Sequence, residues 1–81
     1  MKVKVKFWSY FRDQAGCDET VVELEDNATL ANLVASVYKK FPKLIGTKKC
    51  TLKAVGLDYQ DDDYILSEGD EVSLFPPVQG G

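Results

Sequence analysis

The 81-residue sequence predicts a single α+β domain, built as a mixed sheet with one long helix packed across one face. Three observations lead to this fold class. Residues 2–8 alternate between apolar and polar side chains, as a half-buried strand does. Residues 30–41 place apolar side chains three and four positions apart, as an amphipathic helix does. Two strands are expected before the helix and further strands after it, an order that suits a mixed sheet.

The N-terminal part is expected to hold the first two strands. In the first, the apolar side chains face inward, whereas the lysines and Trp8 face outward. Residues 9–16 form a short turn or a helical piece that Gly16 closes. A second strand follows at about residues 20–24, with its apolar side chains inward.

The middle of the chain is expected to form the long helix. Asn27 and Thr29 are candidate caps at its start, and Pro42 stops it because proline has no N–H group to donate. The mostly polar residues 43–51 are expected to form a loop. The apolar face of the helix consists of Leu30, Leu33, Val34, Val37 and Phe41.

The C-terminal part is expected to complete the sheet. A third strand covers residues 52–57, a short fourth one residues 64–66, and the last one residues 71–75. A turn at residues 67–70 contains Gly69, where a positive φ is expected.

This order of elements predicts a β-grasp, or ubiquitin-like, roll. Its first and last strands then lie side by side and parallel at the centre of the sheet. Residues 1–75 would form the domain and residues 76–81 an extended tail, because two prolines keep the exit of the chain from becoming helical.

Composition excludes several classes of protein. The net charge is −3, with acidic residues gathered at 58–71 and lysines at 39–53, whereas a nucleic-acid binder would be basic overall. No apolar run is long enough to span a bilayer, and the first residues lack the three-part form of a signal peptide, so a cytoplasmic location is expected. Cys17 and Cys50 lack metal-ligand spacing, and neither a disulfide nor a metal site is expected.

Three aromatic residues are candidates for a contact surface. Trp8 and Phe75 end parallel strands, so both should lie at the same end of the sheet and point away from the helix, and Tyr59 can join them. Aromatic residues are enriched in the cores of protein interfaces, which favours a docking patch. The other interpretation is that Trp8 and Phe75 close a small core over residues 9–16.

The chain ends with Gly80 and Gly81, directly after the stiff pair Pro76 and Pro77. A double glycine carries no side chains, so it can enter a channel too narrow for other residues, although terminal glycines are often merely frayed. The sequence has no histidine and no glycine-rich phosphate loop, and no nucleophile–base pair can be assembled from it. The ionised terminal carboxylate is therefore interpreted as a substrate that partner enzymes activate, and the domain as its handle.

Several motifs resemble the small subunits of molybdopterin synthase. The most specific is the ending Phe-Pro-Pro-Val-x-Gly-Gly at residues 75–81. The segment at residues 11–16 resembles the Arg-x-x-x-Gly stretch of that family, through Arg12 and Gly16, and Ala54-Val55 resembles the start of its third strand. Two features depart from the family: Gly56 replaces its usual asparagine, and the acidic run at residues 61–63 is not one of its signatures.

The resemblance implies a sulfur carrier without catalytic activity or bound cofactor of its own. An adenylating enzyme would use ATP to activate Gly81, and a sulfur donor protein would convert it to a thiocarboxylate. The carrier would dock on the large catalytic subunit, in a heterotetramer, and give its sulfur to a pyranopterin precursor on the route to molybdenum cofactor. The implied tail residues are Pro76, Pro77, Val78, Gln79 and Gly80, and the implied partner-binding residues are Trp8, Arg12, Tyr59 and Phe75.

Other functions fit the same ending. A carrier for thiamin thiazole or another sulfur pathway would undergo the same adenylation, and so would a ubiquitin-like modifier that joins Gly81 to lysines of target proteins. An interaction module with an inert tail is the third possibility. No nucleic acid or membrane is expected as a partner.

Overall fold

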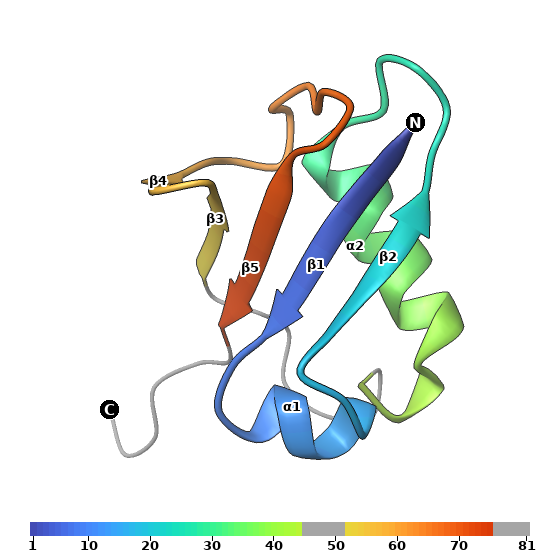
Figure 1. Ribbon diagram of the computed structural model, residues 1–81, viewed down its shortest axis with the longest axis vertical. Helices are drawn as coiled ribbons and strands as arrows, with labels where there is room; N and C mark the ends of the chain where they lie inside the picture. Colours follow the sequence, from blue (N-terminus) through green and yellow to red (C-terminus); the bar gives the residue numbers. More distant parts are fainter. Residues whose placement is uncertain (45–51, 76–81) are drawn as a thin grey trace.

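The computed structural model describes residues 1–44 and 52–75 of the chain. In these residues a mixed sheet with the strand order β2-β1-β5-β3-β4 is covered on one face by helix α2 (Figure 1). The predicted tail, 76–81, and most of the predicted loop, 45–51, lie outside the described residues. In chain order the elements are β1 (Lys2–Phe7), α1 (Tyr10–Ala15), β2 (Glu19–Glu23), α2 (Leu30–Lys40), the 3-10 helix η1 (Pro42–Leu44), β3 (Leu52–Val55), β4 (Asp58–Tyr59) and β5 (Glu71–Phe75).

Strands β1 and β5 occupy the centre of the sheet and run parallel (Figure 1). Val5 lies opposite Val72, and Phe7 opposite Leu74. β2 pairs with β1, and β3 with β5, both antiparallel. The predicted pairing of the first and last strands is therefore confirmed. It brings the ends of β1 and β5 to the same edge of the molecule, next to α1.

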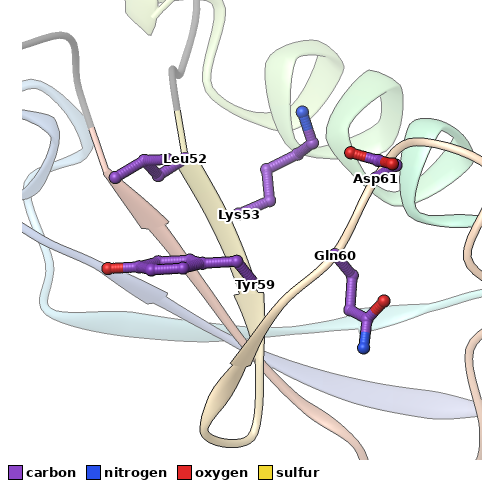
Figure 2. Close-up of a pocket in the computed structure, with 5 residues that line it drawn as sticks. All are labelled: Leu52, Lys53, Tyr59, Gln60 and Asp61. Atoms are coloured by element: carbon purple, nitrogen blue, oxygen red, sulfur yellow. The ribbon is translucent and has the colours of Figure 1, made fainter.

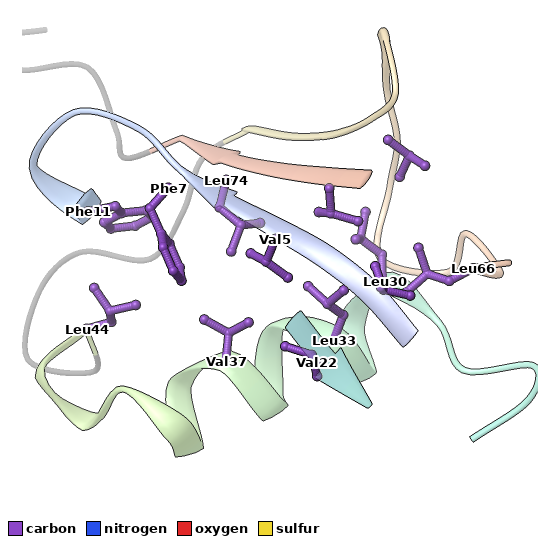
Figure 3. Packing of buried hydrophobic residues seen from close by; sticks show 13 residues of the cluster. Val5, Phe7, Phe11, Val22, Leu30, Leu33, Val37, Leu44, Leu66 and Leu74 are labelled. Carbon is purple, nitrogen blue, oxygen red and sulfur yellow. The ribbon is translucent and has the colours of Figure 1, made fainter. Parts of the chain in front are cut away.

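Helix α2 forms the other wall of the core. Its residues Leu30, Leu33 and Val37 are fully buried, as their spacing predicts. Figure 3 shows Val5 and Leu74 of the sheet on the opposite side of this core. Burying a side chain of this size stabilises the fold by about 1.5–3 kcal/mol relative to leaving it exposed. The buried cluster comprises Val3, Val5, Phe7, Phe11, Val22, Leu30, Leu33, Val37, Leu44, Val55, Leu66, Val72 and Leu74.

The start of α2 is closed by a reciprocal cap. The Thr29 hydroxyl accepts a hydrogen bond from the Asn32 N–H, and the Asn32 side chain accepts one from the Thr29 N–H at 2.9 Å. Thr29 is thus confirmed as the cap. Asn27 instead lies in the preceding turn with φ 68°. Pro42 begins η1, whose Leu44 is buried in the core although the sequence placed it in a loop.

The predicted short strand at residues 64–66 was wrong. The fourth strand is β4, which pairs with β3 through a turn at Gly56 and Leu57, and Ile65 makes only an isolated bridge with Thr29. Residues 62–66 instead cap α2, because the carbonyls of Asp62 and Tyr64 accept hydrogen bonds from the N–H groups of Ala31 and Leu30.

Leu66 explains the apolar pattern that suggested this strand, since its side chain is a core residue. Other boundaries also differ from the prediction: β1 ends at Phe7 rather than Trp8, β2 covers Glu19–Glu23 rather than about 20–24, and β3 ends at Val55 rather than Leu57.

A tight turn connects β1 to α1. The Phe11 N–H bonds the Trp8 carbonyl at 3.2 Å, and Ser9 between them adopts φ 56° and ψ −140°. These angles are those of the first central residue of a type II′ turn, a position that glycine normally occupies. In a residue with a side chain, such strain costs about 1–3 kcal/mol. Beyond the turn, Phe11 is fully buried and anchors α1 to the core (Figure 3).

Candidate functional site

Three aromatic side chains gather on the sheet face that α2 leaves open. The Trp8 and Phe75 rings stack with their centroids 5.8 Å apart and their planes inclined by 14°. The Tyr59 ring meets Phe75 edge to face, with the centroids 6.4 Å apart. The structure thus brings together the three residues that the sequence grouped.

Leu52 extends this group, and the sequence analysis missed it. It lies directly opposite Phe75 in the antiparallel pair of β3 and β5, and 41% of its surface is exposed. Figure 2 shows the side chains of Leu52 and Tyr59 extending to one side of β3 and that of Lys53 to the other. We call Trp8, Leu52, Tyr59 and Phe75 the apolar patch.

The edge of the apolar patch is hollowed and lined in part by polar and charged side chains. Leu52 and Tyr59 line a hollow of about 190 Å³ together with Lys53, Gln60 and Asp61 (Figure 2). Lys53 is held on the far side of β3, where its Nζ lies 2.9 Å from an Asp62 carboxylate oxygen. Of the side chains of the acidic run, that of Asp62 thus forms an ion pair, and residues 61–63 are all exposed.

Two ion pairs lie on the rest of the open face. Lys4 pairs with Glu19 and Lys6 with Glu71, each with the nitrogen and oxygen 3.7 Å apart. Exposed pairs of this kind add little stability, about 0–1 kcal/mol. These pairs lie beside the exposed Val21 of β2, whereas the apolar patch lies over β3, β4 and the ends of β5 and β1.

The exposed fractions of the aromatic side chains distinguish a docking patch from a small core closed over residues 9–16. The exposed fraction is 45% for Trp8 and 66% for Tyr59, which is high for residues that close a core. The core beneath α1 is filled by Phe11 instead. A cluster of exposed apolar side chains next to charged residues is typical of a contact site for another protein.

Arg12 lies beside the apolar patch. It shares with Trp8 a hollow of about 260 Å³, and its Nε lies 3.7 Å from an Asp18 carboxylate oxygen. The predicted partner-binding residues that the structure describes therefore all lie around one end of the sheet. Residue 76, the first of the tail, follows Phe75 directly, so the chain leaves β5 at the apolar patch.

Among residues 1–44 and 52–75, no three His, Cys, Asp or Glu residues are grouped so that they could hold a metal ion. Cys17 is a free thiol, half-buried against the core, and Cys50 lies outside the described residues. No helix in the described part of the chain is long and apolar enough to cross a membrane.

Comparison with known proteins identifies the family. The model of the ThiS family matches residues 5–81, which is nearly the whole chain. The chain belongs to the ThiS family. A molybdopterin synthase sulfur carrier subunit from Chlamydomonas reinhardtii is 34% identical to this ThiS-family chain over 83 residues, with both chains covered completely. Small archaeal modifier protein 3 from Haloferax volcanii is 28% identical over 94 residues, again with both chains fully covered.

Solved structures agree with this assignment. A Pyrococcus furiosus protein assigned as molybdopterin-converting factor subunit 1 superposes on the ThiS-family chain with a TM-score of 0.86 and 34% identity, covering 96% of this chain and 99% of the other. A Helicobacter pylori structure is a complex of subunits 1 and 2 of molybdopterin-converting factor, and its matching chain has a TM-score of 0.68 and 24% identity, with both chains fully covered. The predicted β-grasp fold and the predicted family are thus confirmed.

Proposed function

We propose that this chain is the sulfur carrier subunit of a molybdopterin synthase and has no catalytic activity alone. The observation that carries the proposal is the family match over residues 5–81, which includes the glycine pair, together with curated relatives of that name. The apolar patch supports it, because it places a surface for protein contacts at the point where the tail leaves the domain.

Gly81 is the proposed site of chemistry. In an adenylating partner, its carboxylate attacks the α-phosphate of ATP and pyrophosphate leaves. The terminal sulfur of a persulfide on the sulfur donor protein then attacks the acyl carbon and AMP leaves, which gives an acyl disulfide. A second thiol attacks the donor's sulfur in this disulfide, a protein disulfide forms, and Gly81 is released as the thiocarboxylate. This chain supplies the carboxylate and the docking surface, and the partner enzymes supply the catalytic groups. ATP and a reducing medium that preserves the thiocarboxylate are both available in the cytoplasm, where we place this step.

The large catalytic subunit is the proposed recipient of the sulfur. The carrier docks through Trp8, Leu52, Tyr59 and Phe75, with Arg12 at their edge, while residues 76–81 enter the active site of the partner. The likeness to the Helicobacter pylori complex of subunits 1 and 2 supports an association with a large subunit, and the apolar patch supports the choice of surface. Since a dithiolene needs two sulfur atoms, two carriers act in turn, in keeping with a heterotetramer.

Intact-mass measurement tests the proposal. The chain is incubated with ATP, the adenylating enzyme and a sulfur source, and the expected change is the replacement of one oxygen by sulfur at Gly81. The thiocarboxylated chain should then convert a pyranopterin precursor when the large subunit is added. An unchanged mass in the presence of an adenylating enzyme that activates a known carrier would refute the proposal.

A protein modifier is the second candidate, favoured by the 28% identity to small archaeal modifier protein 3. It would join Gly81 to lysine side chains of other proteins through an isopeptide bond. The same incubation with cell protein separates the two, because a modifier yields a ladder of conjugates. A carrier for thiamin would become thiocarboxylated as well, but it would not support the synthesis of molybdopterin.

A further inference from the structure

The turn between β1 and α1 contains a residue, Ser9, with a strained backbone conformation that no capping hydrogen bond of its side chain explains. Ser9 has φ 56° and ψ −140°, although serine carries a side chain that disfavours this region. Serine is common at the start of helices because its hydroxyl can cap them, but the Ser9 side chain makes no capping hydrogen bond to α1. Its hydroxyl therefore does not account for its place in the turn.

The turn directs two nearby aromatic side chains, those of Trp8 and Phe11, to opposite faces of the sheet. Before it, Trp8 is bound to β5 through a hydrogen bond from its N–H to the Leu74 carbonyl, at 3.3 Å, and its ring stacks on Phe75. After it, Phe11 turns back into the core and is fully buried. The hydrogen bond from the Phe11 N–H to the Trp8 carbonyl, at 3.2 Å, closes the turn between them.

A positive φ at Ser9 is the condition for both placements. A type II′ turn reverses the chain within two residues, and it requires this φ at its first central position. With a negative φ at Ser9 the chain would form a turn of another type and leave it in another direction, so that Trp8 on the open face and Phe11 in the core would not both be kept. The strain persists because contacts on both sides hold it: the burial of Phe11 on one side and the hydrogen bond to Leu74 on the other.

We infer that Ser9 is a positioning residue of the docking surface. Its backbone conformation holds Trp8 against Phe75 in the free protein, so the apolar patch is already formed when the large subunit arrives. This inference rests on the proposed function, since it takes the apolar patch as the surface that the large subunit contacts. Preorganisation of this kind raises affinity by reducing the ordering that binding requires.

Two substitutions at Ser9 separate backbone conformation from side-chain chemistry. Glycine adopts the observed φ without strain, so S9G should keep the affinity for the large subunit and raise the thermal midpoint. Valine is β-branched and cannot adopt it, so S9V should weaken the affinity by about tenfold. The matched control Q14V adds the same residue at an exposed position of α1 and should leave the affinity unchanged.

Spectroscopy reads the position of Trp8 directly, because it is the sole tryptophan of the sequence. The near-ultraviolet circular dichroism and the emission maximum of Trp8 should be retained in S9G and changed in S9V. Loss of both affinity and the Trp8 signal in S9G would overturn the inference, and this measurement remains valid even if S9V does not fold.

A double-mutant cycle with W8A completes the test, with dissociation constants for the purified large subunit measured by calorimetry. If Ser9 acts through Trp8, then S9V should weaken binding in the native background and have no further effect in W8A. An equal effect of S9V in both backgrounds would overturn the inference. If W8A binds the large subunit as tightly as the native chain does, the docking surface of the proposed function is wrong. If W8A binds more weakly but S9V binds as the native chain does, only the role of Ser9 is refuted.

Discussion

Phe75 connects the parts of the apolar patch. Its ring stacks on Trp8, meets the edge of Tyr59 and lies opposite Leu52 across the strand pair. It is also the last residue of β5, so it joins the patch to the segment that carries Gly81. A residue at the centre of an apolar contact surface is where binding energy concentrates.

Replacing Phe75 with alanine should therefore weaken binding to the large subunit by more than about 1 kcal/mol. Calorimetry of the purified pair measures this, with circular dichroism to show that the fold is kept. The control is Val21→Ala, because Val21 is also exposed on the open face but lies on β2, outside the apolar patch. Equal affinities of the Phe75→Ala and native chains would remove Phe75 from the interface.

At the scale of elements, the loop after β4 is a cap rather than a strand. Its carbonyls bind the free N–H groups at the start of α2, and its Leu66 fills the core below. The two neighbours Ile65 and Leu66 differ sharply in burial: the exposed fraction is 58% for Ile65 and 3% for Leu66.

This difference gives a matched pair of variants. Leu66→Ala should lower the free energy of unfolding by about 2–4 kcal/mol, because it removes buried methyl groups and leaves a cavity. Ile65→Ala should change it by less than about 0.5 kcal/mol. Urea titration of both variants measures the effect, and similar losses in the two would contradict the burial described for this loop.

The long elements could be predicted from the sequence because their periodicity is local. Helix α2 and strands β1 and β5 repeat buried positions over several residues, and their order implied the parallel central pair. Phe11 and Leu44 could not be placed, since each lies in a segment too short to show a period. The run at residues 64–66 is short enough to fit a strand or a loop equally.

The candidate site was predictable to the same degree. Trp8, Tyr59 and Phe75 are aromatic and lie at strand ends, so topology alone brought them together. Leu52 depends on the register of β3 against β5, which is set by long-range pairing rather than by local sequence. The positive φ of Ser9 had no sequence signal, because only glycine at that position would have indicated the turn.

At the scale of the whole molecule, stability and the proposed chemistry reside in different residues. Among the described residues, the buried cluster runs from Val3 to Leu74. Deleting Gly81 should therefore abolish the acceptance of sulfur and leave the thermal midpoint nearly unchanged. Intact mass and calorimetric melting of the same sample measure both quantities, and a large fall in the midpoint would show that Gly81 is structural.

The parallel pairing of β1 with β5 has a consequence for biosynthesis. Nearly the entire chain separates these two strands in sequence. β1 can pair with β2 early, but its other edge stays unpaired until β5 has been synthesised. A ribosome that stalls before β5 leaves a fragment whose hydrophobic residues stay accessible to chaperones and proteases. Quality control can thus discard unfinished copies before they compete for the enzymes that a finished carrier needs.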